Sequence, residues 1–218
     1  TVRAIRDLVT TAEARVGQKG SVGVGIPGTI SPATGLVKNA NSTWLNGKPL
    51  DRDLAQALGR EVRAANDANC FTLSEATDGA GKGKRVVFGV ILGTGVGGGI
   101  VVDGKVLTGP NAVAGEWGHN PLPWPDADET PGPACYCGKH GCIETWLSGP
   151  ALIKQFGRPL NPGELVTLAQ GDTRARQTLE RYECRLAKAL ADVVNILDPD
   201  IIVLGGGLSN IDRLYANV

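Results

Sequence analysis

One histidine and three cysteines near the middle of the chain are residues of the types that ligate zinc. They are His119, Cys135, Cys137 and Cys142, and the cysteines lie in the pattern C-Y-C-G-K-H-G-C. One imidazole and three thiolates make a closed tetrahedral Zn²⁺ site of the structural kind. A group of unrelated thiols, one of them reactive, is the other interpretation, and so tight a pattern beside an upstream histidine disfavours it. We therefore predict a zinc-clamped loop over residues 115–144.

Carboxylates stand at both edges of this loop, at Glu116 and Glu144. A metal would fix them in place, ready to accept hydrogen bonds from a ligand rich in hydroxyl groups.

The segment G-T-G-V-G-G-G (93–99) follows the apolar run V-V-F-G-V-I-L and invites a dinucleotide interpretation. That fingerprint needs a helix after the glycines, whereas here β-branched residues and a second turn follow, which predicts a hairpin. A glycine hairpin can still bind phosphate through its N–H groups, with Thr94 adding a hydroxyl donor. An ordinary glycine-rich hairpin is equally consistent with the residues.

Two further positions lie where strands meet helices. Gly205, Gly206 and Gly207 stand between a buried strand and a helix start, where a ribose or planar ligand can approach the backbone, although a tight turn is an equal alternative. Asp67 lies in N-D-A-N, and the residues alone favour a helix N-cap. The alternative is a carboxylate that accepts a proton from a substrate hydroxyl during phosphoryl transfer.

The elements that must position these residues alternate along the chain. Apolar periodicity predicts helices over 2–16, from Asp51 to Leu58, from about 70 to Gly79, and over 173–197, with a further helix opening near Ser209. Strands are expected at 21–26, 61–65, 86–92, 100–106 and 201–204, with a short hairpin around 31–35. The class is α/β with a mixed sheet in each of two domains, 1–84 and 85–218, divided at the glycine-rich loop 79–84.

Composition excludes several functions. The 218 residues carry 22 basic and 22 acidic side chains, so no overall field attracts nucleic acid or an anionic membrane. No apolar run approaches a membrane span and no secretory signal is visible. Five cysteines suit a reducing, cytoplasmic location, with Cys70 and Cys184 expected in the core. Methionine is absent, even at position 1, which suggests a piece of a longer protein.

Six segments occur in a telling order: G-I-P-G (25–28), N-D-A-N (66–69), L-G-T-G-V-G-G-G (92–99), E-W-G-H (116–119), C-Y-C-G-K-H-G-C-I-E (135–144) and L-G-G-G (204–207). Together they resemble the sugar kinases of the ROK family, within the actin-like ATPase superfamily. Segments 38–47 and 195–207 look especially like bacterial fructokinases of the mannokinase type. The resemblance implies an actin-like, ribonuclease H-like fold of two domains that bind sugar and ATP.

The resemblance also implies roles for single residues. Asp67 would be the general base that takes the proton from the sugar's 6-hydroxyl. Sugar hydroxyls would be held by Asn41, Asn66, Glu116, His119 and Glu144. The family's second phosphate loop would be Gly93, Thr94 and Gly95, and its adenosine site would be Gly205–Gly207. The zinc ligands would be His119, Cys135, Cys137 and Cys142. ATP, Mg²⁺ and structural Zn²⁺ are the implied cofactors, and a homodimer is the expected assembly.

One departure from the family is large. The opening pattern D-x-G-G-T, whose Asp helps to hold Mg²⁺, does not occur, so the first strands are expected upstream of Thr1 and the isolated chain is expected to be inactive. Fructose, or mannose, is the favoured substrate. The alternatives are a glucokinase or N-acetylhexosamine kinase, a sugar-responsive repressor, and a zinc-stabilised domain that binds sugar without catalysis. The retained Asp67, both glycine clusters and the lack of a basic helix disfavour the repressor.

Overall fold

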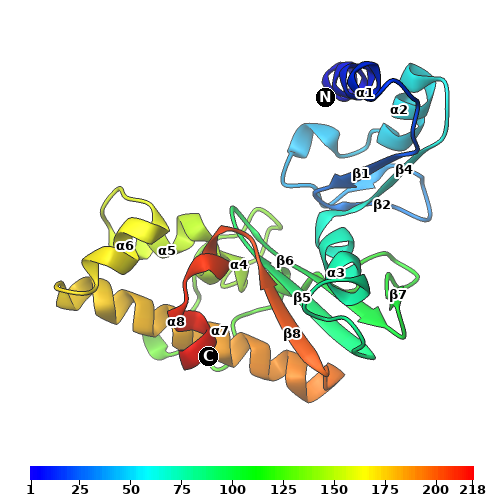
Figure 1. Cartoon of the computed structure of the whole chain (residues 1–218). Helices are drawn as coiled ribbons and strands as arrows, with labels where there is room; N and C mark the ends of the chain where they lie inside the picture. Colours follow the sequence, from blue (N-terminus) through cyan, green and yellow to red (C-terminus); the bar gives the residue numbers. More distant parts are fainter. The chain divides into compact units, whose positions relative to one another are not determined.

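The computed structural model describes all 218 residues, and they form two compact units (Figure 1). One unit contains residues 1–70 and 108–113, and the other contains 71–107 and 114–218. The units therefore separate within α3 (Asp67–Thr77), a few residues before the loop at 79–84. The predicted domain limits themselves stay a prediction.

The first unit is a small α/β layer. Strands β1 (Val22–Ile26) and β4 (Val62–Asn66) pair in parallel, and β2 (Thr29–Ile30) and β3 (Val37–Lys38) form the expected short hairpin. Helices α1 (Val2–Val16) and α2 (Leu50–Leu58) end at glycines with left-handed backbone, as the apolar spacing predicted. The prediction that Asp51 caps α2 is wrong, because this helix begins one residue earlier and no side chain caps it. A 3₁₀ turn, η1 (Thr43–Leu45), completes the unit.

The second unit is built on a mixed sheet in the order β7-β6-β5-β8. Strand β5 (Val86–Leu92) pairs antiparallel with β6 (Val96–Val102) and parallel with β8 (Ile201–Gly205), while β7 (Lys105–Val106) lies at the edge. The hairpin is present, but the expected start of its second strand at residue 100 is wrong. Residues 96–99 lie within β6, because they pair with residues 89–92 of β5. Glycine at position 98 leaves room for Trp117, since a Cβ there would lie 2.7 Å from Trp117 Cδ1.

Alternate residues of β5 face opposite sides of the sheet. Phe88, Val90 and Leu92 belong to the large core that includes α7 (Thr173–Leu197), whose apolar stripe buries Leu179, Tyr182 and Leu186. On the other side Val87 packs in a smaller cluster that includes residues of α3. Figure 1 shows α7 running along one side of this sheet.

The remaining helices of the second unit are short. They are η2 (Trp117–His119), η3 (Ala127–Glu129), α4 (Glu144–Leu147), α5 (Gly149–Phe156), α6 (Pro162–Leu168), η4 (Gly207–Asn210) and α8 (Arg213–Asn217). The helix expected near Ser209 is therefore a 3₁₀ turn, and α8 begins four residues later. Cys70 and Cys184 are exposed, so their predicted place in the core is wrong. No helix is both long enough and apolar enough to cross a membrane.

Candidate functional site

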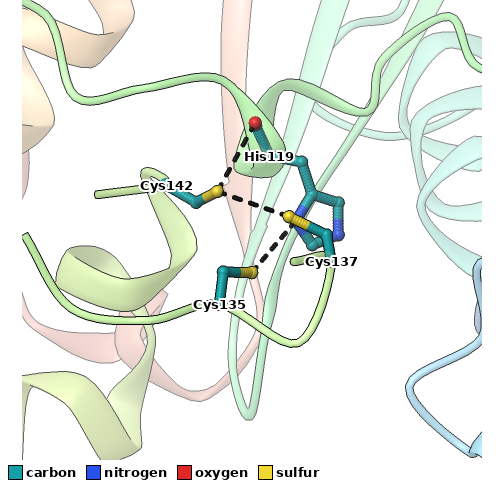
Figure 2. Close-up of side chains that lie close together, drawn as sticks. All are labelled: His119, Cys135, Cys137 and Cys142. Atoms are coloured by element: carbon teal, nitrogen blue, oxygen red, sulfur yellow. Dashed lines mark hydrogen bonds between the residues drawn. The ribbon is translucent and has the colours of Figure 1, made fainter. Parts of the chain in front are cut away.

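The four predicted zinc ligands converge on one point (Figure 2). Their ligand atoms all lie within 4.8 Å of one another. The Cys135 sulfur lies 3.5 Å from His119 Nδ1, and the Cys137 and Cys142 sulfurs lie 3.6 Å apart. Cys135 and Cys142 are buried, whereas Cys137 is exposed.

The Cys135–His119 and Cys137–Cys142 separations match those of a tetrahedral zinc centre. With Zn–S near 2.3 Å and Zn–N near 2.0–2.1 Å, tetrahedral angles place two sulfurs about 3.8 Å apart and a sulfur and a nitrogen about 3.5 Å apart. The observed S···N and S···S distances agree with these values to within a few tenths of an ångström. The residues present therefore fit Zn²⁺ in type, number and spacing.

The electrostatics of the thiols are consistent with a bound cation. Burial raises the pKa of Cys135, and together with the neighbouring thiols it raises the pKa of Cys142 to about 12. The pKa of Cys137 is lowered, because hydrogen bonds from the Lys139 N–H and the other two thiols outweigh its burial. Three clustered thiols thus resist ionising together, and a divalent cation is the group that would stabilise all three thiolates.

Backbone hydrogen bonds shape the loop around this cluster. The Cys135 N–H donates to Lys139 O, and the Gly138 N–H donates to Cys135 O, which folds the C-x-C-G segment into a tight turn. Gly138 has φ 87°, a conformation that glycine adopts readily. On the upstream side, Trp117 anchors η2 by donating from Nε1 to Gly97 O and by packing edge-on against Phe88. His119 is thereby held at the end of η2.

Glu144 connects the metal loop to the glycine hairpin. It is the first residue of α4, two positions after Cys142, and its Oε2 accepts a hydrogen bond of 2.9 Å from the Val96 N–H. A Cβ on Gly95 would lie 2.5 Å from the same oxygen, so only glycine leaves room for this contact. One carboxylate thus lies at both the predicted hydroxyl site and the predicted phosphate loop.

Tyr136 is a residue of this site that the sequence interpretation did not identify. Its hydroxyl lies 3.0 Å from His119 Nε2, and the two rings meet edge to face. Burial raises the pKa of Tyr136, and the carboxylates of Glu144 and Glu116 raise it further. Glu116, which immediately precedes η2, therefore lies close enough for its charge to act on the phenol.

The two glycine clusters lie side by side at the carboxyl ends of parallel strands. Gly205 pairs with Ile91 in the β5–β8 ladder, and a Cβ on Gly206 would lie 2.5 Å from Leu92 O. Gly206 has φ 83°, which favours glycine. The turn after β8 therefore lies against the start of the 93–95 turn, and Thr94 is exposed at its tip. Such an edge is where open α/β sheets bind ligands.

Asp67, Asn66 and Asn41 belong to the first unit. Asn66 caps α3, since its Oδ1 accepts from the Asn69 N–H, and its Nδ2 donates to Gly28 O. The N-cap role that the residues alone favoured for Asp67 is therefore wrong. Burial raises the pKa of Asp67, against the lowering effect of the Ala68 N–H, although the residue as a whole remains exposed. Asn41 is exposed on the loop before η1.

Comparison with known proteins places the chain in a family. The profile of the ROK family matches residues 1–218. The chain belongs to the ROK family. An N-acetyl-D-glucosamine kinase of Escherichia coli O9:H4 (strain HS) is 44% identical to this ROK protein over 224 residues, which cover 99% of the chain and 74% of that kinase.

Solved structures of ROK proteins have the same fold. The ROK hexokinase from Thermus thermophilus superposes with a TM-score of 0.81 at 33% identity, covering 99% of this chain and 73% of the hexokinase. A ROK glucokinase from Streptomyces griseus, solved with glucose and AMPPNP, superposes with a TM-score of 0.79 at 27% identity. The match covers 100% of this chain and 77% of the glucokinase. The predicted α/β, actin-like ATPase fold is confirmed.

Proposed function

We propose that this ROK protein is an ATP-dependent sugar kinase that phosphorylates the 6-hydroxyl of an N-acetylhexosamine. The observation that carries the proposal is the position of Glu144, the last residue of the 115–144 loop, whose Oε2 accepts a hydrogen bond from the Val96 N–H at the glycine hairpin. A carboxylate at that position can bind a sugar hydroxyl next to a loop that binds phosphate. Family membership supports the same reaction class.

The relatives support the proposed identity of the sugar. The resemblance of segments 38–47 and 195–207 favoured fructose, with an N-acetylhexosamine kinase as an alternative. The curated relative described above is an N-acetyl-D-glucosamine kinase at 44% identity. We therefore propose the alternative in place of fructose.

The roles of the side chains follow from their chemistry. Glu116, His119 and Glu144 would hold sugar hydroxyls, since a selective sugar site needs several fixed acceptors. Asp67 would accept the proton of the sugar's 6-hydroxyl. The oxygen of that hydroxyl would bond to the γ-phosphorus of ATP as the bond between this phosphorus and the departing ADP breaks. The raised pKa of Asp67 lies closer to neutral pH than the pKa of an ordinary aspartate does, which suits a general base.

The cofactors have separate roles. Zn²⁺ held by His119 and the three cysteines would be structural, fixing the loop that carries the sugar-binding side chains. Mg²⁺ would neutralise the charge on the phosphates. The chain has no D-x-G-G-T pattern, so we assign none of its residues to Mg²⁺. The nucleotide would be bound by Gly93, Thr94, Gly95 and Gly205–Gly207. Asn41 and Asn66 as sugar-binding residues, the homodimer and the cytoplasmic location also remain proposals.

The test is ADP formation by the natural full-length protein, measured with N-acetylglucosamine, N-acetylmannosamine, glucose, mannose and fructose. We expect the highest kcat/KM with an N-acetylhexosamine. Asp67→Asn should lower kcat by about 10²–10⁴-fold, the usual contribution of a general base, while sugar binding is retained. Sugar binding without any sugar-dependent ADP formation would instead indicate a sugar-responsive regulator or a non-catalytic binding domain.

A further inference from the structure

Tyr136 occupies a constrained position in the metal loop. It lies between Cys135 and Cys137, so its backbone is held on both sides by zinc-ligand residues. Its Oη lies 3.0 Å from His119 Nε2, and the ring centroids are 5.1 Å apart at an interplanar angle of 88°. Since the Nδ1 of the same imidazole faces the Cys135 sulfur, both ring nitrogens of His119 are engaged.

The surroundings of the phenol are unusual for an exposed aromatic residue. The residue is 55% exposed, and its ring contacts the imidazole of His119 edge to face. Its hydroxyl nevertheless lies within the electrostatic influence of Glu144 and Glu116 and beside an imidazole nitrogen. A hydroxyl group 3.0 Å from an imidazole nitrogen is chemically what a sugar hydroxyl would be in the same place.

We propose that Tyr136 is a further specificity-determining residue of the sugar site, with its Oη occupying the place of a substrate hydroxyl on His119 Nε2. Sugar displaces the phenol by rotation of the side chain, because the flanking cysteines hold the backbone still. The freed ring then packs against the apolar C–H face of the bound sugar. This inference rests on the proposed function, since it concerns the same site.

Two opposite effects on affinity follow. The phenol competes with the sugar, so removing only its hydroxyl should tighten sugar binding. A hydrogen bond of ordinary net strength corresponds to about a twofold to tenfold fall in the sugar Kd. Removing the whole ring also removes the packing surface, so an alanine at the same position should bind sugar more weakly than a phenylalanine.

The experiment is calorimetric titration of the zinc-loaded full-length protein with N-acetylglucosamine. The variants are Tyr136→Phe and Tyr136→Ala, and the matched control is Tyr215→Phe, another exposed tyrosine whose hydroxyl donates to Ser209 O. We expect tighter binding by Tyr136→Phe, weaker binding by Tyr136→Ala than by Tyr136→Phe, and no change in the control. Zinc content, measured on every sample, should stay the same.

A second readout does not depend on added sugar. The readout is the ¹⁵N spectrum of the imidazoles, to which residues 1–218 contribute two, His119 and His140. In the sugar-free protein, Tyr136→Phe should shift the His119 Nε2 resonance, and adding sugar to the parent protein should shift it as well. An unchanged Nε2 resonance in the variant would overturn the proposed contact.

The two proposals fail in different ways. If the parent protein binds none of the tested sugars, the proposed function is refuted and this inference falls with it. If the parent protein binds sugar and Tyr136→Phe binds it equally well or more weakly with its zinc retained, only the displacement by sugar is refuted.

Discussion

Substitution of Gly95 by alanine tests the contact that joins the metal loop to the glycine hairpin. The new Cβ would lie 2.5 Å from Glu144 Oε2, closer than such atoms approach. That oxygen is the flexible end of a side chain, so the overlap itself is relieved by rotation of the carboxylate. The main consequence is loss of the 2.9 Å hydrogen bond from the Val96 N–H.

The magnitude follows from the kind of bond that is lost. Hydrogen bonds to charged groups contribute about 1.5–3 kcal/mol, and Glu144 is partly exposed, so we expect a loss of about 1–2 kcal/mol in the free energy of unfolding. Rotation also moves the carboxylate from its place in the proposed sugar site. The sugar Kd should therefore rise about tenfold, the change that corresponds to 1.4 kcal/mol.

The assay is urea unfolding of the zinc-loaded protein followed by tryptophan fluorescence, together with calorimetric sugar binding. Gly93→Ala is the matched control for stability. Gly93 lies in the same hairpin turn, and a Cβ added to it would have no neighbouring atom within 4 Å. We expect the control to change the free energy of unfolding by less than about 0.5 kcal/mol. If Gly95→Ala matches this control in stability and keeps the sugar affinity of the parent protein, the argued role of Glu144 is wrong.

Three further results are expected. Removing zinc with a chelator should loosen the 115–144 loop and raise the sugar KM before kcat falls, and an unchanged KM in metal-free protein would contradict this. Gly98→Ala should destabilise the fold by more than about 2 kcal/mol, because the new Cβ would lie 2.7 Å from Trp117 Cδ1 and 2.8 Å from Gly115 O. The Gly115 oxygen belongs to the backbone and cannot rotate away. A chemical unfolding curve that matches that of the parent protein would argue against this destabilisation. The raised pKa of Asp67 predicts the direction of the pH dependence. The base must be deprotonated, so kcat/KM should fall as the pH drops through a pKa above the ordinary value for aspartate. A pH–rate profile that stays flat down to about pH 4 would contradict the role assigned to Asp67.

Much of the candidate metal site could be predicted from the sequence because the signal is local. Cys135, Cys137 and Cys142 lie within eight residues, and ligand type and spacing alone predict a class of ion. The main helices and strands were also accessible, since α1 and α7 have clear apolar periodicity.

The features that sequence reasoning missed depend on distant partners or on single-residue boundaries. Whether Asn66 or Asp67 caps α3 depends on where β4 ends, and both residues are good caps. The extent of β6 depends on its pairing with β5, and the need for glycine at position 98 depends on Trp117, about twenty positions along the chain. Tyr136 lies between two cysteines of the pattern, and nothing in their spacing shows that its hydroxyl reaches His119.

The position of Glu144 has a thermodynamic consequence. If one carboxylate serves a sugar hydroxyl while it also orders the Val96 amide beside the nucleotide loop, the two ligands share a free energy of coupling. If bound sugar changes the nucleotide affinity by some factor, bound nucleotide must change the sugar affinity by the same factor. Titrating either ligand first would then lead to the same ternary complex by two routes of equal total free energy.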